Sequence, residues 1–323
     1  MLVAFLAIII GLILLCYSAD LFIKTAINIA KYFSWSPLLV GILIIGFGTS
    51  MPEAMVAITA ALQHKSSLAI GNAYGSNIAN IGLIIGVSAV LRPLIVHSKV
   101  VRQELIILLG ISILSLLLLL DLNLSHLDAS ILIILFIFIA IWMIFNSKKK
   151  DIFSQELISE TKLLEKKNPF FITIILLFFA IAILLISSDS LVWGAIKIAH
   201  HLGVSDLIIG LTIIAIGTSL PELATAIAAT RKNETDLVLG NVIGSNIFNT
   251  LIVTGLAGII HPIKIATTIL YRDLPINICL TIILLFITYN KTSTKTIKTI
   301  KIYHGLFLLT CYFIYLITII IYK

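Results

Sequence analysis

The sequence predicts an all-α polytopic membrane protein with ten transmembrane helices, arranged as two inverted five-helix repeats. Three observations lead to this prediction. Hydrophobic residues make up 60% of the 323 positions and charged residues only 11%, which does not suit a water-exposed surface. The apolar residues fall into ten stretches of a length that can cross a bilayer. Two polar motifs inside these stretches occur twice at a constant separation.

Polar or basic residues separate the ten predicted spans. The spans are residues 2–30, 37–62, 67–91, 103–120, 128–146, 169–199, 206–230, 236–260, 267–289 and 303–322. The first span is expected to be retained, because no basic residue precedes it and the apolar pattern continues past Asp20. Between the fifth and sixth spans, residues 147–168 alternate lysines with acidic residues. We therefore predict a first five-helix repeat over residues 1–146, a solvated linker over 147–168 and a second repeat over 169–323.

The two halves of the sequence are copies of one another. GTSMPE at 48–53 returns as GTSLPE at 217–222, and GNAYGSNIAN at 71–80 returns as GNVIGSNIFN at 240–249. Both pairs of motifs are 169 positions apart. The same separation relates Asp20 to Asp189 and Pro93 to Pro262. Because each copy holds an odd number of spans, the second copy enters the membrane upside down, as in the inverted repeats of secondary transporters.

The distribution of basic residues gives the predicted orientation. Of the 22 Lys and Arg residues, 16 fall in loops after odd-numbered spans and four fall in loops after even-numbered spans or at the C-terminus. The positive-inside rule then places the odd loops and the linker in the cytoplasm and both termini outside. The net charge of +7 is thus a topology signal, and no nucleic-acid partner is expected. The three cysteines are widely spaced in apolar runs, which predicts neither a disulfide framework nor a metal site.

Two glutamates are the leading functional candidates. Glu53 and Glu222 lie inside the second and seventh predicted spans, where a lone carboxylate is costly. Pro52 and Pro221 precede them and lack a backbone N–H, so each helix is predicted to break there and leave carbonyl groups unpaired. Free carbonyls at membrane depth require a polar or charged partner. A cation meets this requirement, and the adjacent carboxylate neutralises it.

Hydroxyl and amide groups complete the predicted site. Ser76 and Asn80 share a helix face because they are four residues apart, and Ser245 and Asn249 do likewise. The predicted side-chain ligands are Glu53, Glu222, Thr49, Ser50, Thr218, Ser219, Ser76, Ser245, Asn80 and Asn249. This all-oxygen set suits Ca²⁺ and Na⁺ and needs no cofactor. Two carboxylates balance the charge of one Ca²⁺. If Na⁺ binds to the same ligands, Ca²⁺ and Na⁺ cannot be bound at the same time. Such a site, opened alternately to each side of the membrane, produces antiport.

These motifs resemble the paired alpha repeats of the sodium/calcium exchangers in the cation/calcium antiporter superfamily, and the resemblance covers essentially the whole chain. It implies that Glu53 and Glu222 are the central Ca²⁺ ligands. It further implies backbone oxygen ligands at Thr49, Thr218, Gly46 and Ala215, and Na⁺ sites flanked by Ser50, Ser76, Ser219 and Ser245. Several potassium-dependent members have Asp where this sequence has Asn249, so potassium co-transport is not expected here. The resemblance also makes spans one and six candidates to slide across a fixed core.

Other functions remain open at this stage. A Ca²⁺/H⁺ exchanger could use the same two glutamates, since a buried carboxylate can carry a proton instead of exchanging with Na⁺. A passive channel would respond to no Na⁺ or H⁺ gradient. An intramembrane enzyme is disfavoured because no His or nucleophile lies near the midplane. The expected partners are Ca²⁺, Na⁺ and the lipid bilayer, without an obligate protein partner, in a bacterial cytoplasmic membrane.

Asp20 is expected to pair with Lys24, one helical turn away.

Overall fold

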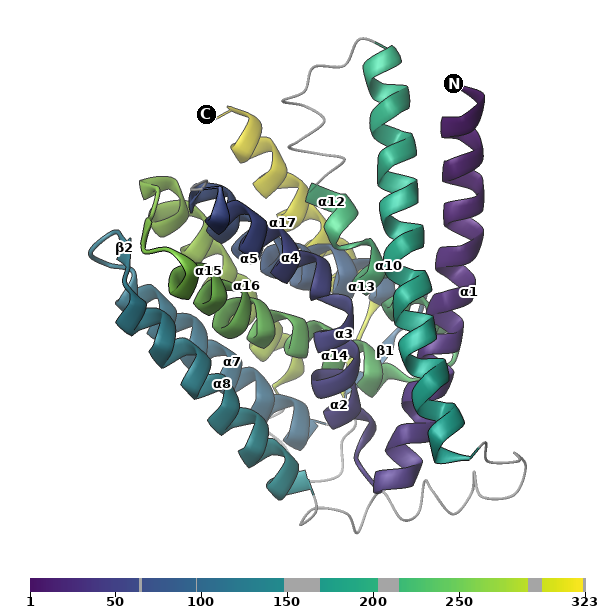
Figure 1. Ribbon diagram of the computed structural model, residues 1–323. Coiled ribbons are helices and arrows are strands. Elements are labelled where there is room, and N and C mark those ends of the chain that lie inside the picture. Colours follow the sequence, from purple (N-terminus) through teal and green to yellow (C-terminus); the bar gives the residue numbers. More distant parts are fainter. Residues whose placement is uncertain (64–65, 97, 148–168, 203–214, 290–297, 322–323) are drawn as a thin grey trace.

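The computed structural model describes residues 1–63, 66–96, 98–147, 169–202, 215–289 and 298–321. Helices dominate these residues (Figure 1). Among the described residues, eight helices are long and apolar enough to cross a membrane, or nine if the bent pair Pro37–Thr49 and Met51–Leu62 counts as one span. The predicted helical membrane protein is therefore confirmed. The predicted span 206–230 lies partly outside the described residues, as does the predicted linker from residue 148 onward.

The described helices follow the predicted spans closely, and their ends differ from the predicted ends by at most five residues. Several are interrupted by π-helical turns, labelled η. The first half contains α1 (Leu2–Phe33), α2 (Pro37–Val40), η1 (Gly41–Gly46), α3 (Phe47–Thr49), α4 (Met51–Leu62), α5 (Ser66–Ala79), η2 (Asn80–Ile85), α6 (Gly86–Leu91), α7 (Ser98–Leu118) and α8 (His126–Ser147). The second half contains α10 (Phe170–His201), α12 (Ala215–Thr218), α13 (Leu220–Arg231), α14 (Thr235–Phe248), η4 (Asn249–Val253), α15 (Thr254–Ile260), η5 (Ile269–Asp273), α16 (Leu274–Thr288) and α17 (Ile302–Ile321).

Both GTSxPE motifs break their helices, as predicted. Ser50 separates α3 from α4 with φ −84° and ψ 11°, and Ser219 separates α12 from α13 with φ −88° and ψ 5°. Pro52 and Pro221 occupy the first turn of the helix that follows, where the missing N–H removes no helical hydrogen bond. The helix axis bends by 44° at the first break. The break falls at the serine two positions before each proline.

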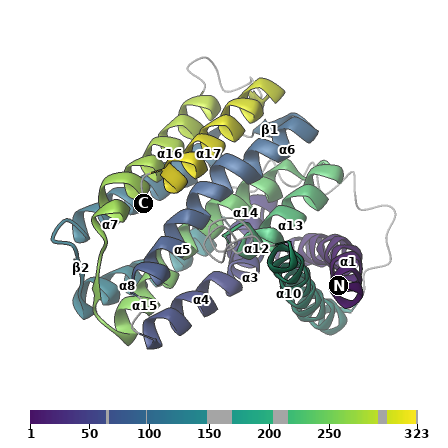
Figure 2. The ribbon, with the colours of Figure 1, turned by 90° about the horizontal axis from the view of Figure 1, so that it is seen from above.

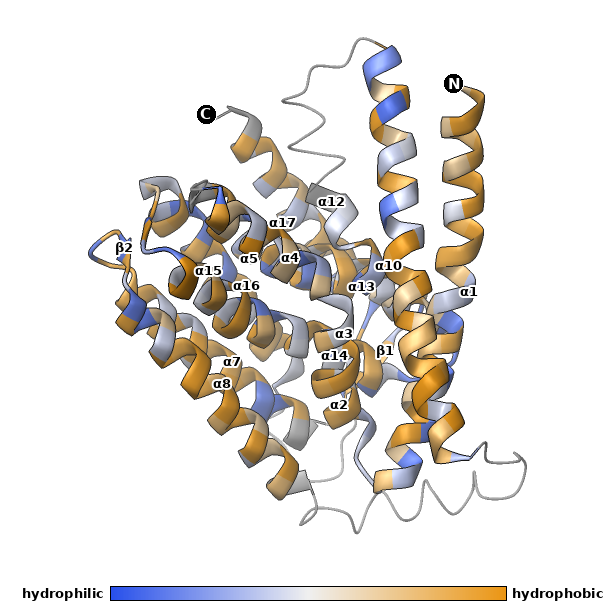
Figure 3. Ribbon diagram, viewed as in Figure 1, coloured by the Kyte–Doolittle hydropathy of each residue, from blue (hydrophilic) through white to orange (hydrophobic). Residues whose placement is uncertain are grey.

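Two long helices, α1 and α10, run side by side along one edge of the molecule (Figures 1 and 2). Glycines allow their close approach: a Cβ atom at Gly194 would lie 2.7 Å from the carbonyl oxygen of Ala4. Hydrophobic residues predominate along α1 and α8 (Figure 3), and many of these side chains are exposed. Such surfaces suit contact with lipid. Besides α10, α1 packs along α13 of the second half.

The centre of the fold is α14, which is buried from Leu237 to its end. Its backbone lies directly against η1, because a Cβ atom at Gly240 would be 2.8 Å from the Cα atom of Gly41. At Gly244 a Cβ atom would be 2.5 Å from the Cα atom of Ile42. Small residues permit such close packing of membrane helices. The matching glycine of α5, Gly75, has no neighbour within 4 Å of its Cβ position among the described residues, which do not include 210–214, the counterparts of most of η1.

Short antiparallel strands were not predicted. β1 (Leu94–Val96) pairs with β4 (Lys298–Ile300), and β2 (Asn123–Leu124) pairs with β3 (Ile263–Lys264). Each pair links the first half of the chain to the second. Strands of two or three residues are too short for a sequence alternation to reveal them.

The predicted pairing of Asp20 with Lys24 is wrong. The Asp20 carboxylate instead accepts a hydrogen bond from Lys232 Nζ at 3.0 Å, and Lys24 is exposed. Lys232 follows the last residue of α13. The packing of α1 along α13 therefore supplies a partner that helical spacing within α1 could not indicate.

Candidate ion-binding site

The two candidate carboxylates occupy equivalent places in the two halves. Glu53 is the third residue of α4 and Glu222 the third residue of α13, each just after a helix break. Both side chains are buried, with 0% and 1% exposed. Ser50, three residues before Glu53, reaches Glu222 with its hydroxyl, which brings the two helix breaks together. Each helix N-terminus favours a negative charge, but two carboxylates in one buried place require positive charge nearby.

Serine hydroxyls hold one oxygen of each carboxylate. Ser50 Oγ donates to Glu222 Oε1 at 3.0 Å, which joins the two halves of the chain. Ser76 Oγ donates to Glu53 Oε1 at 3.3 Å. The other carboxylate oxygens, Oε2 of Glu53 and of Glu222, are buried without a hydrogen bond among the described residues. Each carboxylate is thus oriented by one oxygen and has the other available.

The carbonyl group of Gly46 also belongs to this cluster. It accepts hydrogen bonds from Ser245 Oγ at 3.2 Å and from Thr49 Oγ1 at 3.4 Å. The Thr49 hydroxyl donates as well to the carbonyl of Ile45 at 3.0 Å. A Cβ atom at position 46 would lie 2.7 Å from the backbone nitrogen of Ser245. Glycine at this position therefore allows the carbonyl of the first half to meet the hydroxyl of the second.

The two candidate amides start π-helical turns. Asn80 begins η2 and Asn249 begins η4, and both side chains are buried. Asn80 Nδ2 donates to Asn246 Oδ1 at 2.9 Å, and Asn80 Oδ1 has no hydrogen bond among the described residues. Neither polar atom of the Asn249 side chain has a hydrogen bond in the described part of the chain. π-helical turns are frequent at functional sites because they loosen the regular backbone pattern.

The remaining predicted residues lie at the second break. Ser219 Oγ is buried and has no hydrogen bond to the described residues. Thr218 ends α12 and is partly buried, and Ala215 begins that helix. Pro221 lacks the backbone N–H that would donate to the carbonyl of Gly217 in a regular helix. That carbonyl instead accepts a hydrogen bond from Ser188 Oγ of α10 at 3.1 Å.

Sequence reasoning missed three asparagines that position the site. Asn241 donates to the backbone carbonyl of Glu222 at 3.2 Å and accepts from Thr49 Oγ1 at 3.2 Å. Asn246 Nδ2 donates to the carbonyl of Asn77 at 3.2 Å, so equivalent residues of the two motifs touch. All three asparagines belong to the duplicated GNxxGSN sequence. Their repetition at the same spacing as the glutamates was the signal that could have identified them.

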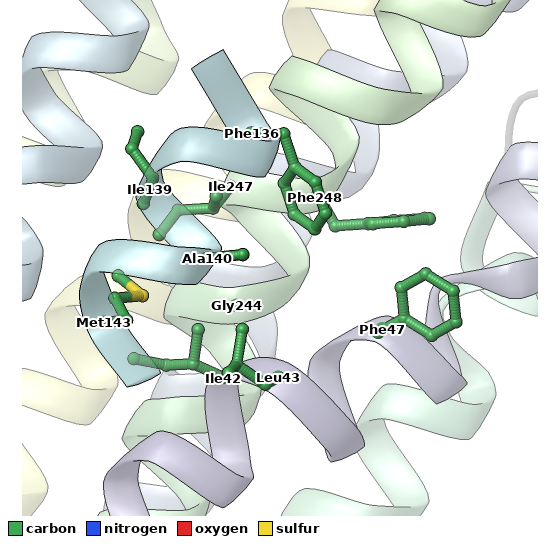
Figure 4. A pocket seen from close by; sticks show the side chains of 10 residues that line it. All are labelled: Ile42, Leu43, Phe47, Phe136, Ile139, Ala140, Met143, Gly244, Ile247 and Phe248. Atoms are coloured by element: carbon green, nitrogen blue, oxygen red, sulfur yellow. The ribbon is translucent and has the colours of Figure 1, made fainter. Parts of the chain in front are cut away.

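A small cavity next to the cluster is not part of it. The cavity measures about 20 Å³ and its wall is formed by η1, α3, α8 and α14 (Figure 4). Its lining residues are Ile42, Leu43, Phe47, Phe136, Ile139, Ala140, Met143, Gly244, Ile247 and Phe248. An apolar lining of this kind offers no ligand to an ion and keeps water out.

The donor set of the cluster is one of hard oxygens. Among the described residues, no three His, Cys, Asp or Glu side chains come together. Carboxylate, hydroxyl, amide and carbonyl oxygens suit Ca²⁺ and Na⁺, while zinc and copper prefer nitrogen and sulfur. The geometry is therefore that of a site for a hard cation with two carboxylates.

Comparison with known proteins identifies the family. The family profile described as sodium/calcium exchanger protein matches residues 3–145 and 172–321. The chain belongs to the sodium/calcium exchanger family. Members of this family are transporters, which agrees with the expectation that the chain is not an enzyme.

Several relatives of this exchanger-family chain are similar over nearly their whole length. The putative antiporter CaxA of Alkalimonas amylolytica is 40% identical over 93% of this chain and 94% of its own. The inner membrane protein YrbG of Escherichia coli is 36% identical over 90% of both chains. The sodium/calcium exchanger MaX1 of Methanosarcina acetivorans is 31% identical over 98% of both chains.

A solved structure supports the same conclusion. The sodium-calcium exchanger NCX_Mj superposes with a TM-score of 0.82, at 30% sequence identity, over 97% of this chain and 97% of its own. Together with the family match, this likeness supports cation/calcium antiport as the activity and an integral membrane location.

Proposed function

We propose that the chain exchanges Ca²⁺ for Na⁺ by alternating access at one shared site built around Glu53 and Glu222. One observation carries the proposal: each half contributes a buried carboxylate with one oxygen held by a serine and the other without a hydrogen bond. Two negative charges buried together are stable only with a cation between them or with protons on them.

Unpaired oxygens supply the free energy for ion binding. Besides the two carboxylate oxygens, the buried atoms Asn80 Oδ1, Asn249 Oδ1 and Ser219 Oγ have no hydrogen bond among the described residues. Each buried polar atom without a partner costs about 1–3 kcal/mol. A hard cation that these oxygens coordinate removes that cost. Four of these atoms, the two carboxylate and the two amide oxygens, contribute to the six to eight oxygens that Ca²⁺ takes, and backbone carbonyls provide the rest. Ser219 Oγ is assigned to Na⁺.

The proposed roles follow from the positions of the donors. Glu53 and Glu222 ligate Ca²⁺ with backbone carbonyls of the two breaks. The break carbonyls assigned to this role are those of Gly46, Thr49, Ala215 and Thr218. The donors assigned to flanking Na⁺ positions are Ser50, Ser76, Ser219 and Ser245. The Asn80 and Asn249 amide oxygens are assigned as further ligands of the ion held by the two carboxylates. Because Ca²⁺ and Na⁺ share ligands, occupancy by one excludes the other, and exclusion at a site that opens alternately to each side couples their movements.

We extend the proposal to topology and location. The plan is ten spans in two inverted repeats, with both termini outside and the linker 147–168 in the cytoplasm. The excess of lysine and arginine in loops after odd spans supports this orientation. The relative YrbG is an inner membrane protein, which supports a bacterial cytoplasmic membrane as the location. A neutral amide at Asn249 in place of a third carboxylate supports exchange that is independent of potassium.

Equilibrium binding tests the proposal without any gradient. Purified protein should bind ⁴⁵Ca²⁺, Na⁺ should displace it with a Hill coefficient above one, and K⁺ at equal ionic strength should not. Glu53→Gln and Glu222→Gln proteins should bind no Ca²⁺ in the same range. Displacement by lowered pH but not by Na⁺ would move the assignment to Ca²⁺/H⁺ exchange. Binding retained in both variants would exclude the proposed site.

A further inference from the structure

An ion pair joins the outer helix α1 to α13. Lys232 Nζ lies 3.0 Å from Asp20 Oδ1, and the two side chains are 25% and 49% exposed. Lys232 caps the C-terminus of α13, where the helix dipole favours a positive charge. Glu222 stands in the first turn of the same helix. The pair therefore connects the outer helix to an element that carries a site carboxylate.

Among the described residues, the internal repeat offers this ion pair on one side only. Asp20 and Asp189 are equivalent, being 169 positions apart, and the same separation relates Lys232 to Gln63. The mirror-related contact would join Asp189 of α10 to residue 63 at the end of α4. That position is an amide, which cannot form an ion pair. In the described part of the chain, α10 also makes no packing contact with α4 comparable to that of α1 with α13.

We infer that Asp20 and Lys232 are positioning residues that bias the access equilibrium. They favour the conformation with α1 packed along α13 over the mirror-related conformation with α10 packed along α4. The inference rests on the proposed function, because it assumes that the two inverted halves exchange these arrangements during transport. An exposed or partly exposed ion pair shifts such an equilibrium by about two- to fivefold. Because residue 63 is glutamine, the conformation with α10 packed along α4 gains no such ion pair with Asp189.

Distance measurements between spin labels test the inference in the full chain reconstituted in liposomes. The labels replace Tyr17 of α1 and Arg231 of α13, which are both exposed, after Cys16, Cys279 and Cys311 are changed to serine. Asp20→Asn and Lys232→Gln should each increase the longer-distance population about two- to fivefold relative to the shorter one. The charge swap Asp20→Lys with Lys232→Asp should restore the original ratio. Lys24→Gln, an exposed neighbour outside the pair, should change nothing.

A variant at the equivalent position of the other half provides an independent test of the inference. Gln63→Lys offers Asp189 a partner and should increase the longer-distance population in the same direction. Combining Gln63→Lys with Asp189→Asn should abolish that increase. The inference fails if the single variants lower thermal stability but leave the distance ratio unchanged, or if the charge swap does not restore the ratio. Since these measurements need no ion gradient, their failure leaves the proposed exchange untouched, and failure of the ion-binding test leaves them interpretable.

Discussion

Ser50 and Glu222 are 172 positions apart in the sequence, yet the Ser50 hydroxyl donates a hydrogen bond to Glu222 Oε1 at 3.0 Å. This bond crosses from the first GTSxPE motif to the carboxylate of the second. The converse bond, from Ser219 to Glu53, is not among the hydrogen bonds of the described residues, and Ser219 Oγ is left without a partner. The two halves therefore contribute equivalent residues to one site in different roles.

Ser50→Ala should weaken Ca²⁺ binding about tenfold. The substitution removes a hydrogen bond to a charged group, which contributes about 1.5–3 kcal/mol, and releases Glu222 from its orientation. Equilibrium ⁴⁵Ca²⁺ binding by the purified protein measures the effect, and Ser50→Thr, which keeps the hydroxyl, is the control. An unchanged affinity in Ser50→Ala would show that the bond does not prepare Glu222 for the ion.

Ser219→Ala should separate ligation from folding. Its hydroxyl is buried with no hydrogen bond among the described residues, so its removal should not lower the melting temperature measured without Na⁺ or Ca²⁺. The rise in melting temperature on adding Na⁺ should nevertheless shrink, because one ligand is lost. Thermal unfolding with and without Na⁺ measures both quantities. A full Na⁺ response in the variant would remove Ser219 from the ligand set.

Gly244→Ala should destabilise the protein, whereas Gly110→Ala at an exposed position of α7 should not. A Cβ atom at position 244 would lie 2.5 Å from the Cα atom of Ile42, while position 110 has no neighbour within 4 Å among the described residues. Overpacking against backbone costs about 1–3 kcal/mol or more. Replacing an exposed helical glycine by alanine instead gains up to about 1 kcal/mol. Equal melting temperatures for the two variants would contradict the close packing of α14 on η1.

Asn249→Asp should make the protein more dependent on bound ions. A third buried carboxylate should repel Glu53 and Glu222, which lowers the melting temperature without ions, and should enlarge the stabilisation by Ca²⁺. Asn277→Asp is the matched control, since Asn277 is equally buried in α16 with no hydrogen bond to its amide among the described residues. It should lower stability without changing the Ca²⁺ response. Identical Ca²⁺ responses in the two variants would place Asn249 outside the site.

Most of the fold could be predicted because its causes are local. Span positions follow from the lengths of the apolar runs, and the breaks at Ser50 and Ser219 follow from the prolines two residues later. The partner of Asp20 could not be predicted in this way. Helical spacing indicates Lys24, but Lys232, 212 positions away, is brought there by packing between the halves.

The asymmetry of the site was equally hidden. Ser76 and Ser245 occupy identical GSN sequences, but Ser76 donates to Glu53 while Ser245 donates to the carbonyl of Gly46. The packing of α14 against the backbone of η1 accounts for the bond from Ser245 to Gly46, whereas residues 210–214, the counterparts of most of η1, lie outside the described residues. Duplicated motifs predict which residues gather in the cluster around the two breaks. The tertiary arrangement of the halves decides which bond each residue makes.

The most direct test of the central claim is ⁴⁵Ca²⁺ uptake into proteoliposomes loaded with Na⁺ and diluted into Na⁺-free buffer. Uptake should follow the Na⁺ gradient, should be absent with a pH gradient alone, and should fall to background in Glu53→Gln and Glu222→Gln proteins. Na⁺-driven uptake that survives in both variants would contradict the two-carboxylate site. Uptake driven only by the pH gradient would contradict Na⁺ coupling.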